Sequence, residues 1–578
     1  MARPFTQPRP GPPREERLTD LFEAAAALHG ERPALEGEGL RLTYRDLDAA
    51  SSRLARLLAE RGAGPGVHVG ILLPRSPAMI IAVLAVLKAG AAYVPLDPEY
   101  PPGRVEAILG DAGARLLVSD LGLSSRIGLG PWDLVLPDRE GPALDALPCQ
   151  PVPQRAGPGD PCYAIFTSGS TGRPKGVSVS HRAACNLVRA EGWIFGVEPE
   201  DRVYQGFSLA FDASVEEIWL AFHAGACLVV ADAMTARSGP LLPAWLGAKG
   251  ITVLSTVPTV LGTFQEDIPG LGLLIVGGEA CPPDLAARWA PGRRLVNTYG
   301  PTEATVIATW TDLEPGRPVT IGRAIPNLRT LVLDAELRPA APGAEGELCL
   351  AGAGLALGYL GRPDLTAERF PTLRDGTRIY RTGDKVREGE DGDLLFLGRL
   401  DDQVKLRGFR IELGEIEAAL RLQDGVLEAA AAVRPWGGGE ILVGYVALRP
   451  GAPSPAALRQ ALGALLPPYM VPSRILALEA LPLLPSGKLD RKALPPPPAA
   501  EGGAADAAEA PATETEAALA SAWAGAFHRP VGPGDDFFTD LGGHSLLAAV
   551  MVSGLRPRPG FGTLSVPDVY AFPTVRAL

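Results

Sequence analysis

Along most of the chain, from residue 18 to about residue 397, segments with the apolar spacing of helices alternate with short apolar runs typical of strands. Helical spacing covers residues 51–61, and strand-like runs lie at residues 67–73, 114–118 and 252–254. Such alternation favours a layered α/β architecture, in which helices cover the faces of a mostly parallel sheet. We therefore expect an α/β multidomain protein whose large layered domain occupies residues 18–397.

The remaining sequence divides into four further segments. We expect a disordered lead-in at residues 1–17 and a small mobile α+β subdomain at residues 398–493. A linker is expected at residues 494–512 and a C-terminal unit at residues 513–578. The lead-in is rich in Pro and Arg. The linker has four consecutive prolines followed by Ala, Gly and Glu, a composition that cannot form a packed core. In the small subdomain, residues 413–422 are predicted to form a helix and residues 441–448 a strand.

Composition limits the classes of function. The chain has 578 residues, too many for one core, and 46% of them are hydrophobic, which excludes global disorder. A formal net charge of -12 disfavours nucleic acid as a partner, because phosphate backbones attract basic surfaces. The six cysteines have no metal-binding spacing, so we expect reduced thiols in a cytoplasmic protein. We see no signal-peptide pattern, and the apolar run at 78–87 is too short for a membrane segment.

A loop rich in glycine and hydroxyl residues, Thr167 to Gly176, follows the apolar residues 163–166. Glycines let backbone N–H groups approach an anion, hydroxyl groups add donors, and Lys175 adds a positive charge. The spacing differs from the Walker A pattern. A flexible polar surface loop is the alternative, but four hydroxyl residues interleaved with three glycines favour a phosphate-binding loop.

Nine further motifs are arranged around this loop. They are Leu42–Tyr44, Leu87–Asp97, Phe211–Ser214, Asn297–Glu303, Gly346–Leu348, Tyr380–Asp384, Gly398–Gly408, Leu466–Pro472 and Pro485–Arg491. In order and content they resemble the signatures of the adenylate-forming enzymes, which include acyl-CoA synthetases, luciferases and the adenylation domains of nonribosomal peptide synthetases. The resemblance covers residues 18–493. The form of the motif at 87–97 is similar to the peptide synthetase branch rather than the acyl-CoA branch.

This resemblance implies adenylation, in which a carboxylate attacks the α-phosphorus of ATP and pyrophosphate leaves. Two anions must meet, so the site needs cations and donors where charge develops. The implied nucleotide-binding residues are Thr167, Ser168, Thr171 and Lys175 for the departing phosphates, Gly278, Tyr299 for adenine, Thr302 for the α-phosphate, Asp384 for the ribose hydroxyls and Arg399 near the ribose. Glu303 is the implied Mg²⁺ ligand.

The resemblance gives two residues a role that depends on domain motion. Lys488 would bridge the substrate carboxylate and the transferring phosphate, a task that suits a flexible point charge. A solvated lysine in a turn is the alternative, but the match of Pro485–Arg491 to the family's last motif opposes it. Asp401 resembles the family's hinge. One orientation of the small subdomain would deliver Lys488 for adenylation, and the other would present the Gly408 region for thioester formation.

The C-terminal unit contains Asp536–Leu546, which resembles the peptidyl carrier signature. The resemblance implies a four-helix carrier domain in which a phosphopantetheinyl transferase attaches 4′-phosphopantetheine to Ser545. A serine before an apolar run also suits a helix N-cap, and both interpretations can hold. The last helix of such a domain should begin near residues 573–578, which leaves truncation or a longer natural chain open.

The resemblance also places an amino-acid pocket. Its positions fall on Asp212, Ala213, Glu216, Ser255, Ile275, Gly277, Thr298, Val306 and Ile307, closed by Lys488. Asp212 would pair with the substrate's α-ammonium, and Glu216, a carboxylate in an apolar pocket, would need a positive partner. A substrate ammonium meets this need, and an ion pair inside the protein is the alternative. The pattern resembles lysine-activating domains, but Thr298 and Ile307 depart from it and leave ornithine, 2,4-diaminobutyrate and β-lysine open.

The expected function is activation of an amino acid, foremost lysine, and its transfer to the carrier, in nonribosomal peptide or amino-acid homopolymer biosynthesis. Residues 556–560 are similar to the carriers of ε-poly-lysine-type synthetases. We find no H-H-x-x-x-D condensation motif and no G-x-S-x-G thioesterase motif, so a downstream condensing or polymerising partner is expected. An acyl-CoA ligase is one alternative, against which Asp212 and the carrier argue. A non-catalytic scaffold is another, against which Lys488, Glu303 and Asp384 argue.

Overall fold

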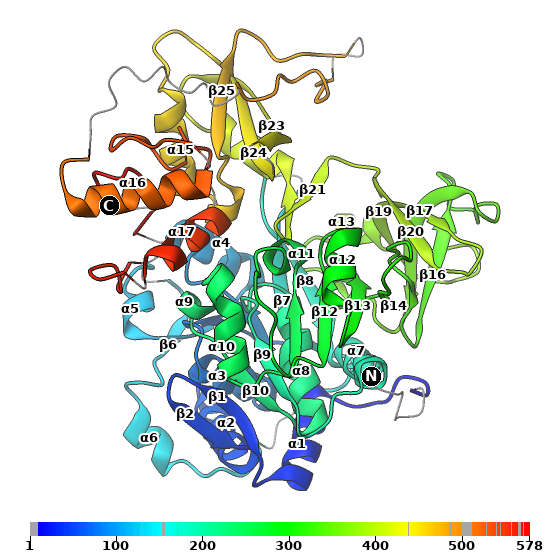
Figure 1. Ribbon diagram of the computed structural model, residues 1–578. Helices are drawn as coiled ribbons and strands as arrows, with labels where there is room; N and C mark the ends of the chain where they lie inside the picture. Colours follow the sequence, from blue (N-terminus) through cyan, green and yellow to red (C-terminus); the bar gives the residue numbers. More distant parts are fainter. Residues whose placement is uncertain are drawn as a thin grey trace.

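The computed structural model describes most of the chain. The described residues are 10–128, 130–152, 156–169, 172–436, 439–484, 488–498, 511–527, 529–538, 540–543, 545–556, 558–564, 568–569 and 572–578. They form a large domain, a small subdomain and a carrier domain (Figure 1). In Figure 1 the large domain fills the lower part, the small subdomain lies at the top, and the carrier, in orange and red, lies at the left.

In the described part of the large domain, one sheet has seven strands in the order β18-β8-β7-β4-β3-β5-β6. The strands are β3 (His68–Leu72), β4 (Ala92–Pro95), β5 (Leu116–Ser119), β6 (Asp133–Val135), β7 (Pro161–Thr167), β8 (Lys175–Ser180) and β18 (Gly358–Tyr359). β3 to β7 pair in parallel, whereas β8 pairs antiparallel with β7 and β18. The glycine-rich loop therefore connects two adjacent antiparallel strands.

A second sheet has nine strands among the described residues, in the order β15-β14-β13-β12-β11-β9-β10-β1-β2. They are β1 (Pro33–Gly37), β2 (Leu40–Thr43), β9 (Arg202–Gln205), β10 (Cys227–Val230), β11 (Val253–Thr256), β12 (Leu273–Gly277), β13 (Arg294–Tyr299), β14 (Thr309–Asp312) and β15 (Arg323–Ala324). From β1 to β13 the neighbours pair in parallel, while β2, β14 and β15 add antiparallel edges.

Helices cover both sheets. The longer ones are α1 (Leu18–His29), α2 (Tyr44–Glu60), α3 (Pro77–Lys88), α4 (Pro102–Ala112), α7 (His181–Phe195), α8 (Ala213–Ala224), α10 (Leu242–Ala248), α12 (Pro283–Trp289) and α13 (Pro363–Arg369). The short ones are α5 (Leu121–Ser124), α6 (Gly141–Ala146), α9 (Ala233–Ala236), η1 (Gly239–Leu241), α11 (Pro258–Leu261) and η2 (Thr302–Ala304). No helix in the described residues is long and apolar enough to span a membrane.

The central strands are buried on both faces, which explains their continuous apolar sequences. In β12, Leu273 and Ile275 belong to the main core, which also contains residues of α3, α7, α8 and the seven-stranded sheet. Leu274 and Val276 point to a second core, which is closed by α10 and α12. α7 and α8 therefore pack in the main core beside the end of β12.

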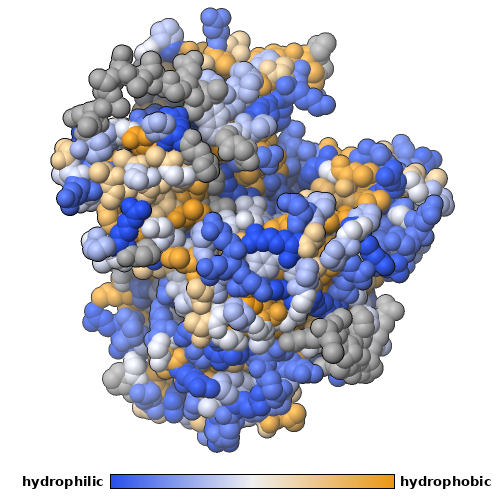
Figure 2. Space-filling view, viewed as in Figure 1, coloured by the Kyte–Doolittle hydropathy of each residue, from blue (hydrophilic) through white to orange (hydrophobic). Residues whose placement is uncertain are grey.

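An antiparallel four-stranded sheet and the small subdomain follow. The sheet contains β16 (Leu328–Leu333), β17 (Glu345–Gly352), β19 (Ile379–Glu388) and β20 (Leu394–Arg399). The small subdomain contains β21 (Gln403–Leu406), β22 (Phe409–Glu412), α14 (Leu413–Arg421), β23 (Val426–Trp436), β24 (Gly439–Leu448), α15 (Pro455–Gly463), η3 (Pro468–Met470) and β25 (Arg474–Leu478). Figure 2 shows a mostly hydrophilic face that is hollowed between the four-stranded sheet at the right and the subdomain at the top.

The carrier domain is less completely described. Its described residues include two long helices, α16 (Glu514–Phe527) and α17 (Ser545–Leu555), which pack around Trp523 and Phe537. Residues 565–567 and 570–571 lie outside the described residues, so the four-helix expectation stays a prediction. Most of the predicted linker, residues 499–510, also lies outside them.

The elements predicted from sequence are present with shifted ends. The strands expected at 67–73, 114–118, 252–254 and 441–448 are β3, β5, β11 and β24, and the helix expected at 413–422 is α14. The helix expected at 51–61 already begins at Tyr44. Thr43 causes this earlier start, because its hydroxyl oxygen accepts a hydrogen bond from the Asp46 backbone N–H at 3.1 Å.

Part of the segment predicted to be a disordered lead-in contacts the large domain, and its disorder stays a prediction. Residues 1–9 lie outside the described residues, but residues 15 and 16 contact α7. Arg182 binds Glu15 at 2.6 Å, and Arg189 binds Glu16 at 2.6 Å. These ion pairs tie the segment to the large domain, an effect that its Pro-rich and Arg-rich composition does not reveal.

Candidate nucleotide and amino-acid site

Four of the predicted pocket residues lie at the carboxyl ends of parallel strands. Ser255 is in β11, Ile275 and Gly277 are in β12, and Thr298 is in β13. The strand register pairs Ser255 with Ile275 and Gly277 with Thr298. A Cβ atom at Gly277 would lie 2.5 Å from the Thr298 hydroxyl oxygen, so this strand end accommodates only glycine without a shift. Ligands of open α/β sheets bind at such strand ends.

The other predicted pocket residues come from two segments at the same end of the sheet. Asp212 directly precedes α8, whose first turn contains Ala213 and Glu216. Val306 and Ile307 follow η2, and the backbone of Val306 has a φ of 69°. A β-branched residue rarely adopts this left-handed conformation, which marks a strained segment of the kind found at functional sites.

Asp212 is a buried carboxylate with a raised pKa. Its side chain is hydrogen-bonded by the hydroxyl of Thr302, the first residue of η2. Burial raises the pKa of Asp212 to about 6, and the Thr302 hydrogen bond opposes this rise. An ammonium group would stabilise the ionised form, as expected for the residue that pairs with a substrate's α-ammonium.

Glu216 is buried one helical turn after Asp212, with 2% of its surface exposed. Its Oε1 accepts a hydrogen bond from the Ser255 hydroxyl at 2.6 Å. Burial raises the pKa of Glu216 to about 7, and no lysine or arginine of the described residues pairs with it. The alternative of an ion pair inside the protein therefore has no cation among the described residues.

A second buried glutamate, Glu191 of α7, lies within hydrogen-bonding reach of Glu216. Sequence reasoning missed this residue. A signal was available, because apolar residues stand three and four positions before it and after it, at Leu187, Val188, Ile194 and Phe195. A charged residue in the middle of an apolar helical stripe must face the core.

Glu303, the predicted Mg²⁺ ligand, is fully buried among cationic and phenolic groups. Arg410 of β22 donates to its Oε2 at 2.6 Å, and the Tyr359 hydroxyl donates to its Oε1 at 2.7 Å. Lys175 lies 3.6 Å from Oε1. Burial by itself raises the pKa of Glu303, but the charges of Arg410 and Lys175 outweigh it and lower the pKa well below its usual range. The carboxylate is thus ionised, as a Mg²⁺ ligand must be.

The glycine-rich loop is held by residues of the small subdomain. The Ser168 hydroxyl donates to the carbonyl oxygen of Arg410 at 2.8 Å, and the Gly169 N–H donates to Glu415 at 3.1 Å. Glu415 is in turn paired with Arg104 at 2.6 Å. A carboxylate therefore receives a backbone N–H of the loop predicted to bind phosphates. Thr171 lies outside the described residues.

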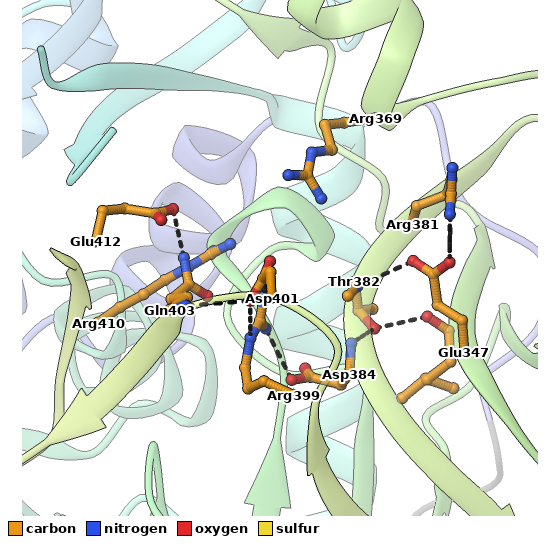
Figure 3. A network of polar contacts seen from close by, with 12 residues as sticks. Glu347, Arg369, Arg381, Thr382, Asp384, Arg399, Asp401, Gln403, Arg410 and Glu412 are labelled. Atoms are coloured by element: carbon orange, nitrogen blue, oxygen red, sulfur yellow. Dashed lines mark hydrogen bonds and ion pairs between the residues drawn. The ribbon is translucent and has the colours of Figure 1, made fainter. Parts of the chain in front are cut away.

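Tyr299, Asp384 and Arg399 form a connected group (Figure 3 shows the part around Asp384). The Tyr299 hydroxyl donates to one oxygen of Asp384, and Arg399 donates to the other at 2.7 Å. Arg399 also binds Asp401 at 2.7 Å, so the predicted ribose residues are linked to the predicted hinge. The ammonium of Lys405 lies 5.2 Å from the centre of the Tyr299 ring.

The structure does not bring Lys488 to this site. The residue is exposed to solvent, and the small subdomain turns the hairpin of β21 and β22 toward the large domain instead. The Gly408 N–H, at the turn of this hairpin, donates to Glu279 of the large domain. This orientation is the one predicted to present the Gly408 region, and it explains why Lys488 is absent from the pocket.

The carrier domain contacts both other parts of the chain. Arg474 donates to the carbonyl oxygen of Asp540 at 3.2 Å, and the Ser553 hydroxyl donates to the carbonyl oxygen of Ser238. Ser545 is the first residue of α17. A cavity of about 30 Å³ lies between the small subdomain and the carrier, and Gly543 is among its lining residues.

The residues present fit ATP and Mg²⁺. The hydroxyl oxygen of Thr167 is buried without a hydrogen-bond partner in the described residues, as expected for a group that awaits a ligand oxygen. Gly278 follows β12 with a φ of 78°, a left-handed conformation that favours glycine. Glu303 offers one carboxylate, and Mg²⁺ in such sites is usually completed by phosphate oxygens and water.

Three family models match the chain in succession. Residues 22–360 match the AMP-binding enzyme model, residues 415–488 its C-terminal domain, and residues 517–578 the phosphopantetheine attachment site. These domains imply ATP with Mg²⁺ and a phosphopantetheine arm.

Two relatives and one solved structure are similar over nearly the whole chain. The delta-poly-L-ornithine synthetase of Acinetobacter baumannii is 40% identical over 97% of this chain and 43% of its own length. Novobiocin biosynthesis protein H of Streptomyces niveus is 42% identical over 98% of this chain and 96% of its own length. A solved NRPS protein with adenylation and PCP domains, bound to a vinylsulfonamide inhibitor, superposes with a TM-score of 0.78 at 28% identity, covering 97% of this chain and 96% of its own.

The chain thus spans less than half of the first of these relatives and nearly all of the second. Domain order, fold and relatives agree with one another and with the site geometry. The chain therefore belongs to the AMP-binding enzyme family, as the adenylation domain of a nonribosomal peptide synthetase-type ligase followed by its peptidyl carrier domain.

Proposed function

We propose that this chain adenylates a diamino acid, foremost lysine, and transfers it to a phosphopantetheine thiol on Ser545. The observation that carries the proposal is the buried carboxylate of Glu216, which has a hydroxyl partner in Ser255 but no cation among the described residues. A buried carboxylate is costly until a cation joins it. The distal ammonium of a diamino acid supplies that cation, while its α-ammonium pairs with Asp212.

The similarity to a poly-L-ornithine synthetase supports a diamino acid as the substrate class. Lysine, ornithine and 2,4-diaminobutyrate share a distal primary ammonium and differ in the length of the chain that carries it. The carrier domain implies a phosphopantetheinyl transferase and a downstream condensation partner. We infer that the aminoacyl thioester serves a nonribosomal peptide or a homopolymer of the amino acid.

In the proposed reaction sequence, the small subdomain acts in two orientations. For adenylation, Lys488 binds the substrate carboxylate and the transferring phosphate, while Glu303 would hold Mg²⁺, which would supply positive charge to the phosphates. For transfer, the hairpin of β21 and β22 enters the site and the carrier contacts the enzyme. The observed positions of Gly408 and the exposed Lys488 support assignment of this structure to the transfer orientation.

Selectivity tests the proposed substrate. In a pyrophosphate-exchange panel of amino acids, we expect the highest kcat/KM for lysine, then ornithine, and poor use of leucine and norleucine. Glu216→Gln should lower kcat/KM for lysine more than tenfold, about 1.4 kcal/mol, because the amide cannot neutralise the ammonium. Norleucine, which has no distal charge, should lose comparatively little.

Highest exchange with an apolar or an acidic amino acid would refute the proposed substrate and leave the family assignment intact. Coenzyme A as an acceptor is the control for acyl-CoA ligase activity. Formation of a free CoA thioester at the rate of carrier loading would favour that alternative function.

Backbone rotation at residue 401 tests the two orientations. Asp401→Pro restricts φ, and we expect it to retain one half-reaction while losing the other at least tenfold. Asp401→Asn is the matched control, because it removes the ion pair with Arg399 but keeps the backbone free. Pyrophosphate exchange reports adenylation, and loading of radiolabelled amino acid reports transfer. Equal loss of both activities in the proline variant would point to misfolding rather than to a hinge.

A further inference from the structure

Glu191 is a fully buried acid that has no role in the proposed adenylation reaction. It lies on α7, which packs against α8, and its exposed fraction is 0%. No hydrogen-bond donor among the described residues reaches either of its carboxyl oxygens. An ionised carboxylate in this state would have no compensating contact, so burial favours its neutral form.

Glu217, the neighbour of Glu216 on α8, shows what a structural buried glutamate looks like in this protein. Its Oε1 accepts from the Gly206 N–H at 2.8 Å, and its Oε2 accepts from the Phe207 N–H at 3.1 Å and from the Gln205 amide at 3.0 Å. Every oxygen of that carboxylate has donors from the adjacent backbone. Glu191 has none of these, so a purely structural role does not account for it.

The group that reaches Glu191 is the carboxyl group of Glu216, and two carboxyl groups at hydrogen-bond distance must share a proton. Burial and the charge of Glu216 raise the pKa of Glu191 well above its usual range. The hydrogen bonds from Ser255 and Glu191 oppose the rise in the pKa of Glu216, which stays at about 7. The Ser255 hydroxyl donates to Glu216 at 2.6 Å, whereas no donor among the described residues reaches Glu191, so the hydrogen bonds favour Glu216 as the ionised member and Glu191 as the neutral acid.

We propose that Glu191 is a second specificity-determining residue, which donates its proton to Glu216 and offers its carbonyl oxygen to the distal ammonium of the substrate. This inference rests on the proposed diamino-acid specificity and adds a residue to it. The pair carries a single negative charge, which matches the single positive charge of a distal ammonium. Two ionised carboxylates would leave one buried charge unbalanced.

The arrangement also supplies hydrogen-bond acceptors in suitable number. A primary ammonium has three donors and no acceptor. Glu216 and the carbonyl oxygen of Glu191 accept two of its hydrogen bonds, while Ser255 and the acid proton of Glu191 keep Glu216 fixed in place. A norleucine side chain would leave these buried groups unpaired, and sites built around such groups reject ligands that lack the complement.

Two substitutions of Glu191 separate this role from a structural one. Gln retains both a donor toward Glu216 and a carbonyl oxygen, so Glu191→Gln should keep kcat/KM for lysine within about threefold of wild type. Met has similar volume but neither group, so Glu191→Met should raise KM for lysine more than tenfold with little change in kcat. Glu198→Gln, the same chemical change on an exposed residue just after α7, is the matched control.

The ratio of lysine to norleucine exchange within one variant does not depend on the fraction of protein that is folded. We expect this ratio to fall more than tenfold in Glu191→Met and to stay near wild type in Glu191→Gln. An unchanged ratio in Glu191→Met overturns the proposal. Equal loss in Glu191→Gln and Glu191→Met also overturns it, since the acid would then act through its charge.

The pH dependence of KM gives an independent readout. The groups that interact with Glu216 in the described residues are Ser255 of β11, Glu191 of α7, Asp212 before α8 and Glu217 of α8, none of them a cation. Glu216 binds the ammonium only when ionised, so KM for lysine should fall as pH rises from about 6 to 8. Glu191→Met removes a hydrogen bond that favours ionisation and should move this fall to higher pH, whereas Glu191→Gln should not.

Failure of this inference can be told apart from failure of the proposed function. If wild-type enzyme prefers lysine or ornithine but Glu191→Met keeps that preference, the role of Glu191 is refuted and the diamino-acid assignment stands. If wild-type enzyme prefers an apolar or acidic amino acid, both are refuted.

Discussion

Replacement of Lys488 by alanine is expected to lower lysine-dependent pyrophosphate exchange at least 100-fold, about 2.7 kcal/mol in the transition state, while ATP binding changes little. The lysine is proposed to contact the carboxylate and the phosphate that react, so its loss removes a positive charge that stabilises the transition state. In the observed orientation Lys488 is exposed. Its removal therefore has no cost in packing, and a loss of activity cannot be assigned to unfolding.

The same variant should retain the second half-reaction. In the transfer orientation the hairpin of β21 and β22 faces the site, so loading from synthetic lysyl adenylate should stay within about threefold of wild type. Lys492→Ala, another exposed lysine of the same segment, is the matched control and should keep both activities. Pyrophosphate exchange within a few-fold of wild type in the Lys488 variant would refute the catalytic role.

Replacement of Ser545 by alanine should abolish covalent attachment of radiolabelled lysine and leave pyrophosphate exchange unchanged. Adenylation needs no carrier, whereas thioester formation needs the arm that a phosphopantetheinyl transferase attaches to this hydroxyl. Ser545 is the first residue of α17 and Ala is a good helix former, so the helix should persist. Gel autoradiography after treatment with the transferase and coenzyme A measures the attachment.

Wild-type protein without transferase treatment is the matched control for this experiment and should also stay unlabelled. The mass increase of the phosphopantetheine arm should be present in treated wild type and absent from the Ser545 variant. Labelling of the treated variant would place the attachment site elsewhere in the chain.

Much of the fold could be predicted because its signals are local. The short apolar runs that form β3, β5, β11 and β24 indicate strands by their own residues, and the apolar spacing of residues 413–422 indicates the helix α14. The contacts of the lead-in could not be predicted, because Glu15 and Glu16 meet arginines of α7 that lie far away in the sequence. Composition describes the cost of ordering a segment but not the partners that offset this cost.

Site residues that belong to sequence motifs could be predicted, whereas residues brought to the site by the packing of helices could not. Glu216 was found through its place in a family pattern. The apolar positions around Glu191 predict only that it is buried, and its approach to Glu216 depends on the packing of α7 against α8. The orientation of the small subdomain was not predictable either. The sequence that contains Lys488 is proposed to serve two arrangements of the small subdomain, and residue spacing does not select between them.

The contacts made by Arg410 and Glu415 lead us to expect that the small subdomain competes with magnesium pyrophosphate for the site. Arg410 places a positive charge on the predicted metal ligand Glu303, and Glu415 places a carboxylate on the loop predicted to hold the departing phosphates. Magnesium pyrophosphate and the small subdomain would then exclude each other, as two ligands of one site do. We therefore expect added magnesium pyrophosphate to lower the share of enzyme that can load its carrier.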